Sequence, residues 1–339
     1  MAIEDEARRI YDDLILIDGL NVSNWNSSAV YDSLSAGGVT AINATIAIWE
    51  DYPDTLDHIA TWLGRFRELS DKLIQVKSVD DIRLAKQNGK IGVILGWQNA
   101  SPIGNRLDRL ELFYSLGVRI IQLTYNERNL LGNGCYERTD GGLSHFGVEA
   151  VREMNRLGIL IDLSHVGEPT MLDAIKVSDK PVACTHANAR AHFDHVRNKS
   201  DDVLRRIADM GGVIGANAFP LFLPAGFEST ADDFVDVIED LINRVGIDHV
   251  GIGTDYTQDQ PPEFFEWLFM LQGTKPRDAY KPLPHPLLHP RGMETPDKLP
   301  NLSGALLRRG HSEDNIRKIL GGNWLRMLEA VWFDDVTSR

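Results

Sequence analysis

The sequence predicts a single parallel (β/α)8 barrel that spans residues 1–339. Eight short apolar strands alternate with segments of helical length, and no change in composition marks a domain boundary. The length suits one large barrel or two ordinary domains. A doubly wound sheet is the alternative. The turn after the first strand reads DGLNVSNW rather than GxGxxG, so dinucleotide binding has little support.

The predicted strands are short, largely apolar runs of the kind that parallel sheets bury on both faces. We expect them at 14–20, 38–48, 90–97, 118–124, 159–163, 181–185, 213–216 and 249–253. Helices are expected where apolar residues recur every three or four positions and where glycine ends the pattern. They are predicted at 4–13, 52–73, 79–87, 107–116, 146–157, between 164 and 180, and at 201–209, 232–245, 312–320 and 323–331. A Pro-rich insertion around 257–300 contains one candidate helix, at 264–270.

Composition and charge exclude several classes of partner. The net charge is -14, from 35 basic and 49 acidic residues, which argues against nucleic acid or an anionic membrane surface. Neither terminal segment resembles a signal peptide or an anchor, and no apolar run approaches the ~18 residues of a membrane span. The two cysteines, Cys135 and Cys184, predict no disulfide framework, because Cys184 lies in a probable buried strand. We therefore expect a cytoplasmic protein with a small-molecule substrate.

The most informative stretch runs from Ile159 to His186. Two apolar runs, ILIDL and PVACT, each lead to a histidine, and one helix-length segment separates them. Neighbouring parallel strands end on the same side of a sheet, so His165 and His186 should converge. Converging imidazoles predict a metal site. The alternative is two unrelated histidines at the starts of loops.

The other predicted strand ends supply few metal ligands. Asp255, in GIGTDY, is the only carboxylate among them, and it is either a third ligand or the base that takes a proton from water. The alternative for Asp255 is a helix cap or a salt bridge in a loop. Gln98 offers an amide oxygen, a weaker ligand than a carboxylate. The strand-end positions are Leu20, Val22, Gln98, Tyr125, His165, His186 and Asp255.

An arginine after the sixth strand is a candidate for substrate recognition. Arg190 and Arg197 lie in the segment ARAHFDHVRN, and either could bind a substrate carboxylate through two parallel hydrogen bonds. The alternative is a surface arginine, the common fate of this residue type. The loops 126–142 and 257–300 are expected to cover the pocket.

Several motifs resemble those of the membrane (renal) dipeptidases, peptidase family M19. They are GGLSHFGVEAVREMNRLGILIDLSHV, PVACTHANARAHFDHVRN, GIDHVGIGTDY and GGNWLRML, and they occur in the family's order along nearly the whole chain. The resemblance implies a barrel of the metallo-dependent amidohydrolase type with two zinc ions. It also implies hydrolysis of dipeptides or related amides, and a homodimer.

The resemblance assigns roles position by position. His165 and His186 match the two histidines that hold one zinc ion, and Asp255 matches the aspartate on the other. Arg197 matches the arginine that binds the substrate carboxylate. Tyr125 stands where the family often has a histidine near the scissile group.

Three departures put the two-metal centre in doubt. The family's first strand ends in DGHND, whereas this chain has DGLNV, so Leu20 and Val22 replace two ligands. Gln98 replaces the glutamate that bridges the metals. Leucine and valine have no lone pair to offer, and Asp255 alone cannot balance two dications in a low-dielectric pocket.

Three functions remain open from the sequence. The first is a dipeptidase-like hydrolase that acts on a small carboxylate-bearing amide with at most one divalent metal, zinc by expectation, on His165 and His186, with Gln98 as a weak ligand. The second is a metal-free pseudoenzyme that binds a small carboxylate in the same pocket. The third is ordinary dipeptidase activity, retained despite the lost ligand positions Leu20 and Val22.

Overall fold

The computed structural model describes residues 3–276, 282–287 and 289–332, and its parallel strands form a single sheet. The strands are short and buried, as the apolar runs predict. Their bounds are β1 (Ile17–Asn21), β2 (Ala41–Ala47), β3 (Leu73–Gln75), β4 (Ile91–Trp97), β5 (Val118–Gln122), β6 (Leu160–Asp162), β7 (Ala183–Cys184), β8 (Val213–Ala216) and β9 (Val250–Ile252).

The sheet closes into a barrel of eight strands. Its order is β2-β1-β9-β8-β7-β6-β5-β4-β3, and a further pairing between β2 and β4 closes the ring. The remaining strand, β3, pairs only with β4 in the described part of the chain and lies outside the barrel. The predicted (β/α)8 barrel is therefore confirmed.

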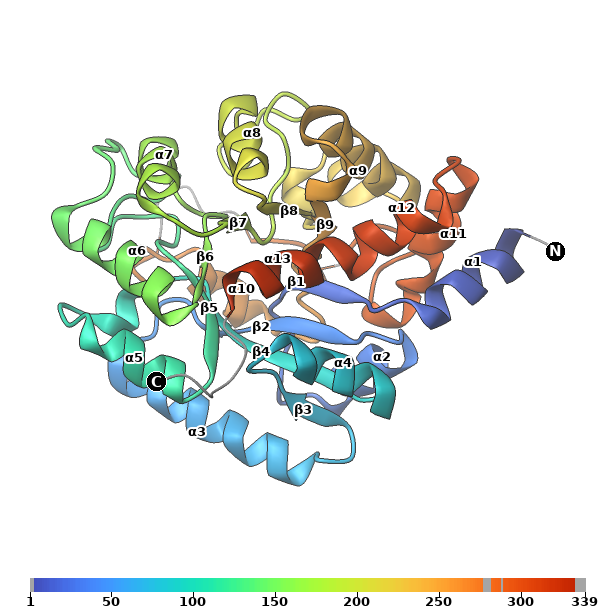
Figure 1. Cartoon of the computed structure of the whole chain (residues 1–339), viewed down its shortest axis with the longest axis horizontal. Helices are drawn as coiled ribbons and strands as arrows, with labels where there is room; N and C mark the ends of the chain where they lie inside the picture. The colour runs from blue at the N-terminus through green and yellow to red at the C-terminus, as the bar shows by residue number, and fades with distance from the viewer. Residues whose placement is uncertain (1–2, 277–281, 288, 333–339) are drawn as a thin grey trace.

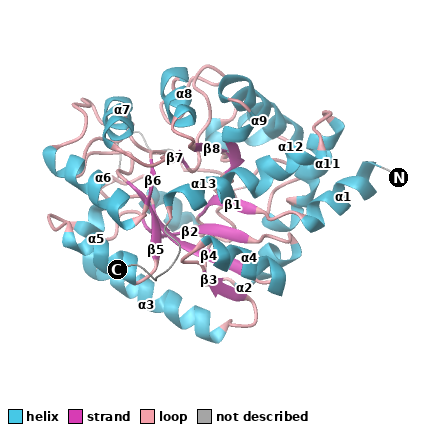
Figure 2. Cartoon of the chain, viewed as in Figure 1, coloured by secondary structure: helices cyan, strands magenta, loops and turns pink. Residues whose placement is uncertain are grey.

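Helices surround the strands on the outside, as Figures 1 and 2 show. They are α1 (Ile3–Asp13), α2 (Ser28–Ala36), α3 (Tyr52–Glu68), α4 (Val79–Asn88), α5 (Asp108–Ser115), α6 (His145–Leu157), α7 (Glu168–Val177), α8 (Asp201–Asp209), α9 (Ala231–Val245), α10 (Pro262–Leu268), α11 (Pro300–Arg308), α12 (Glu313–Arg317) and α13 (Asn323–Val331). Within the described ranges, none combines the length and apolar character needed to cross a membrane.

Local signals place most helix boundaries. Ser78 and Asp81 form a reciprocal capping box at the start of α4, and Gly89 ends that helix in a left-handed conformation. Gly158 ends α6 in the same way. These caps satisfy backbone groups that a helix end would otherwise leave unpaired.

Four elements, α3, β3, α2 and α11, differ from the sequence prediction. The helix expected over 52–73 ends at Glu68, because the residues that follow turn back to form β3. The chain between β1 and β2 forms α2, whose preceding residue, Ser27, makes no side-chain capping bond. The Pro-rich segment ends in α11, which starts at Pro300, and proline is tolerated in the first turn of a helix.

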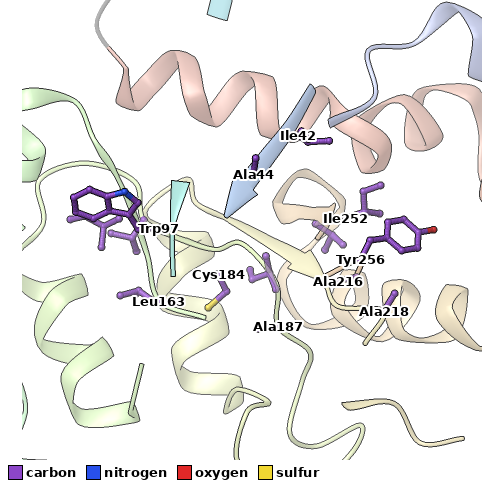
Figure 3. Packing of buried hydrophobic residues seen from close by; sticks show 14 of the residues in the cluster. Ile42, Ala44, Trp97, Leu163, Cys184, Ala187, Ala216, Ala218, Ile252 and Tyr256 are labelled. Carbon is purple, nitrogen blue, oxygen red and sulfur yellow. The ribbon is translucent and has the colours of Figure 1, made fainter. Parts of the chain in front are cut away.

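The core lies both around the barrel wall and inside the barrel. Figure 3 shows wall residues from five strands packed in one cluster: Ile42, Ala44, Trp97, Cys184, Ala216 and Ile252. Inside the barrel, the indole of Trp324 from α13 reaches the strands, and its Nε1 donates to the Ile252 carbonyl (3.0 Å). A Cβ added at Gly19 or Gly251 would lie within 2.6 Å of that indole, so glycine makes room for it.

Candidate active site

The side chains predicted at the strand ends gather at the carboxyl end of the barrel. One small cavity is lined by Val22, Gln98, Tyr125, Asn126, Tyr136, His165, Arg197, Phe219, Phe222, Asp255, Thr257, Leu268 and Phe269. Both loops expected to cover the pocket contribute to this lining. The cavity holds about 30 Å³, roughly the space of one water molecule.

The two histidines after β6 and β7 meet directly. His165 Nε2 and His186 Nε2 lie 2.9 Å apart, and His186 is completely buried. Burial, with an added effect of the nearby Arg197 guanidinium, holds the pKa of both imidazoles well below the usual value. Both rings are therefore neutral at pH 7, the form in which histidine binds metals.

The outer nitrogens of the two rings are held by neighbouring side chains. His165 Nδ1 lies 2.8 Å from the acceptor oxygen Asn126 Oδ1, so Nδ1 carries the proton and donates. His186 Nδ1 lies 2.8 Å from the Thr185 hydroxyl. Which of these two groups donates depends on where the Thr185 proton goes.

Asp162, the last residue of β6, decides that question. Its Oδ1 accepts from the amide of Thr185 (2.9 Å) and from the amide and hydroxyl of Ser164, while its Oδ2 accepts the Thr185 hydroxyl (2.6 Å). Burial raises the pKa of Asp162, while the four hydrogen bonds that its carboxylate accepts act in the opposite direction. Because Thr185 then donates to Asp162, His186 Nδ1 donates to Thr185.

Both inner nitrogens consequently carry lone pairs that face each other. Hydrogen bonds that hold the outer nitrogen and leave the inner one free to accept are also typical of histidines that bind metals. The set of ligands is nevertheless short. Within the residues that the structure describes, no group of three or more His, Cys, Asp or Glu side chains could hold a metal ion.

Leu20, Val22 and Gln98, the three positions expected to have lost metal ligands, offer no anionic group. Leu20 and Val22 are buried and apolar, and Val22 lines the cavity. Gln98 also lines it, but its amide nitrogen is committed to the Thr45 hydroxyl on β2 (3.0 Å). Its amide oxygen is the one group at these positions that could approach a cation.

Asp255 lies at the carboxyl end of β9 with a left-handed backbone, φ +59°. Its Oδ2 accepts from Asn217 Nδ2 (3.2 Å). Burial raises the pKa of Asp255 to about 6, while Arg197 and the Asn217 bond act in the opposite direction. A carboxylate with such a pKa can exchange a proton near neutral pH, as a general base requires.

Arg197, rather than Arg190, faces the cavity. Arg197 is almost completely buried, donates from Nη1 to the Ser164 carbonyl, and donates from Nη2 to the His186 carbonyl (3.4 Å). Its Nε is buried without a hydrogen-bond partner in the structure. Arg190 pairs instead with Glu168 (3.2 Å), away from the cavity.

Tyr125 stacks on the His165 ring, with ring centroids 4.1 Å apart. The sequence alone did not reveal the residues that hold the histidines, Asn126 and Thr185, or the partner of Asp255, Asn217. It also missed Lys199, a buried amine that donates to the Val166 carbonyl (3.2 Å) and whose pKa burial lowers to about 8. The signal for Thr185 was its place directly before His186. The left-handed backbone of Asn126, which asparagine tolerates, is invisible in one sequence.

Together, the closed barrel and the polar side chains at its carboxyl end define an amidohydrolase-like (β/α)8 protein. A family model described as membrane dipeptidase (peptidase family M19) matches residues 4–267 and 287–335. The chain belongs to this family, which confirms the resemblance found in the sequence.

Curated relatives carry the same description over part of their length. The chain is 34% identical over 280 residues to dipeptidase tcpJ of Claviceps purpurea, covering 81% of this chain and 59% of that protein. It is also 34% identical over 282 residues to an uncharacterized dipeptidase of Schizosaccharomyces pombe, covering 81% and 61%. The chain thus spans about three fifths of these curated relatives.

Solved structures match over nearly the full chain. A crystal structure described as an amidohydrolase from Pseudomonas aeruginosa is 43% identical, with a TM-score of 0.93, and the match covers 96% of this chain and 99% of that one. A metallopeptidase from Rhodobacter sphaeroides, liganded with a phosphinate mimic of the dipeptide L-Ala-D-Ala, shares the fold at 24% identity and a TM-score of 0.79, over 94% and 100%.

Proposed function

We propose that this protein hydrolyses a small amide or dipeptide that bears a carboxylate, using at most one divalent metal ion. The observation that carries the proposal is the pair of converging nitrogens, His165 Nε2 and His186 Nε2, with both outer nitrogens held by Asn126 and Thr185. This pair would hold one ion after the two nitrogens move slightly apart from their hydrogen-bonding distance. The neutral residues at the three replaced positions do not fit a second.

Zinc suits two imidazoles and an amide or water ligand, and when bound it would polarise a carbonyl group or lower the pKa of a bound water. His165 and His186 would hold it, with Gln98 as a weak third ligand. We infer zinc from the ligand type and the family, because imidazole serves several other divalent metals.

The remaining roles belong to residues of the cavity wall. The Asp255 carboxylate would take a proton from the attacking water, since its raised pKa lies near neutral pH. The Arg197 guanidinium would attract the substrate carboxylate, because among the described residues its Nε has no hydrogen-bond partner and its other nitrogens donate only to backbone carbonyls. Tyr125, packed on His165, would shape the space around the scissile bond.

Substrate entry requires movement of side chains. The cavity has room for about one water, and Phe219, Phe222 and Phe269 occupy much of its wall. A dipeptide can bind only when some of these rings turn away, so we expect slow or weak binding of bulky substrates.

The test combines metal content with activity. Protein purified without chelator, and again after incubation with zinc, is analysed for metal per chain and assayed on a panel of dipeptides. We expect at most one ion per chain. The His165→Ala and His186→Ala variants should lose metal and hydrolysis together, whereas His145→Ala, an exposed histidine at the start of α6, should lose neither. Two ions per chain in the unmodified protein would overturn the reduced site.

A metal-free binding protein is the second candidate. It is favoured by the absence, among the described residues, of a cluster of three acidic, histidine or cysteine ligands. If chelated protein binds a dipeptide analogue as tightly as untreated protein, and neither hydrolyses any dipeptide, this function replaces the first.

Three broader features are proposed with the function. We infer a single-domain chain in which the 257–300 segment is an insertion, a homodimer by family resemblance, and a cytoplasmic location. Size-exclusion chromatography coupled to light scattering tests the dimer.

A further inference from the structure

A second cavity lies beside the candidate active site. It holds about 400 Å³, within the ~300–1,000 Å³ of typical small-molecule sites, whereas the candidate active site holds about 30 Å³. Val22 lines both cavities. Thr45 lines the second and accepts a hydrogen bond from Gln98 of the first, so two of the replaced ligand positions form the partition.

The walls of the second cavity are rich in aromatic rings from different elements. Trp62 of α3 contacts Trp25, with ring centroids 5.3 Å apart, and Phe264 and Trp267 of α10 supply further rings (6.0 Å). Trp25, Phe264 and Trp267 are only partly buried. Partly exposed rings around a space of this size favour a flat, apolar ligand, because aromatic groups stack on one another or meet edge to face.

One cation of this cavity is available to a ligand. Arg65 lies over the Trp62 ring (5.0 Å) and donates from Nη2 to Asn26 Oδ1 (2.7 Å). In the part of the chain that the structure describes, the bond to Asn26 is the one hydrogen bond that the Arg65 guanidinium donates, and no carboxylate pairs with it. A guanidinium with a free edge binds a carboxylate through two parallel bonds.

The one carboxylate in the cavity wall is already engaged. Glu50 accepts from the backbone amide of Ile48 (2.6 Å), and its other oxygen lies 3.7 Å from His58 Nδ1. His58 Nδ1 in turn contacts the Ile46 carbonyl (2.9 Å). Glu50 is therefore engaged by neighbouring groups of the protein, so Arg65 determines that the cavity prefers a negatively charged ligand.

We propose that this cavity, lined by Trp25, Trp62, Arg65, Phe264 and Trp267, is a binding site for a small aromatic carboxylate, separate from the candidate active site. The ring would lie among the tryptophans while the carboxylate meets Arg65. The proposal does not depend on a metal or on hydrolysis, because neither His165 nor Asp255 lines this cavity.

The test is a calorimetric titration with 3-phenylpropanoate, with tryptophan fluorescence as a second readout. We expect saturable binding that weakens at least tenfold in Arg65→Gln. The uncharged 3-phenylpropanamide and the non-aromatic 3-cyclohexylpropanoate should also bind at least several-fold more weakly. Arg67→Gln is the matched control, since Arg67 lies on the same helix but is exposed and does not line the cavity.

Asp255→Asn separates this site from the active site. Binding of 3-phenylpropanoate should be unchanged in that variant even if it abolishes hydrolysis, because Asp255 lies on the other side of Val22. Absence of binding to the unmodified protein would overturn the proposal. So would binding that Arg65→Gln leaves intact, or binding that depends on Asp255, which would place the probe in the candidate active site.

Discussion

Strands β1 and β6 carry the same carboxylate arrangement but lead to different side chains. Asp18 accepts the Thr254 amide (2.8 Å) and hydroxyl (2.7 Å) beyond β9, and Asp162 accepts the Thr185 amide (2.9 Å) and hydroxyl (2.6 Å) beyond β7. Each aspartate thus ties its strand end to a neighbouring strand. After Asp162 the chain presents His165, whereas after Asp18 it presents Leu20 and Val22.

The residues that hold the backbone at a site are different from the residues that could bind its metal. The hydrogen bonds that fix the backbone are present in both strands, although Leu20 and Val22, which follow Asp18, carry no group that could bind a metal. Since Asp18 and Asp162 serve the backbone, their presence does not report whether a metal binds. Only the side chains that could contact the metal carry that information.

The largest expected effect comes from placing metal-binding side chains after β1 and β4. The triple variant Leu20→His, Val22→Asp, Gln98→Glu adds an imidazole and two carboxylates to a backbone that is already held. We expect two zinc ions per chain, measured by elemental analysis, where the unmodified protein has at most one. Gln98→Glu alone is the control and should not bind a second ion. A folded triple variant without a second ion would show that β1 is wrongly aligned with the family.

A smaller effect is expected on the way the stability of the protein depends on pH through Asp18 of β1. Burial raises the pKa of Asp18 to about 7, above its unfolded value of 3.8, so the folded protein binds more protons between these pH values. Its contribution to stability is therefore present at low pH and is lost as pH rises from about 4 to about 7, by at most about 1.4 kcal/mol per pH unit.

Asp18→Asn, which mimics the protonated side chain, should remove that part of the pH dependence of urea unfolding. The exposed Asp57→Asn is the control. An unchanged slope between about pH 5 and about pH 7 in Asp18→Asn would contradict the raised pKa.

The smallest effect is expected from removing the hydroxyl group of Thr185 or of Thr254. Thr185→Val and Thr254→Val each remove a buried hydroxyl that donates to an aspartate, so each should cost about 1–3 kcal/mol in the free energy of unfolding. Only Thr185 also holds the outer nitrogen of His186, so only Thr185→Val should weaken zinc binding, by about 10–100-fold. Equal zinc affinity in the two variants would show that Thr185 does not orient His186.

The sequence predicted the barrel well because apolar runs and glycine stops repeat along the chain. It missed β3 and α2, whose short segments carry no strong pattern, and α11, which emerges from a Pro-rich stretch. These elements depend on packing against the rest of the fold. Propensity alone does not reveal such packing.

For the site, the shared topology of two strands was enough to predict that His165 and His186 converge. Position in the sequence left Arg190 and Arg197 equivalent and only the family resemblance favoured Arg197, whereas the three-dimensional path of the loop shows that Arg197 lines the cavity. Asn126 and Asn217 could not be predicted, because each acts through a contact with a residue distant in sequence. Nor could the second cavity, whose walls come from β2, α3, α10 and the loops after β1 and β2.

The position of Trp324 near the end of the chain determines when the barrel interior can be filled during synthesis. All the barrel strands precede residue 253, yet the side chain that fills the space beside Gly19 and Gly251 is synthesised some seventy residues later. During translation, the nascent strands would therefore enclose an unfilled interior until that tryptophan has left the ribosome. A chain stopped before α13 should remain a loosely packed species that chaperones and proteases recognise.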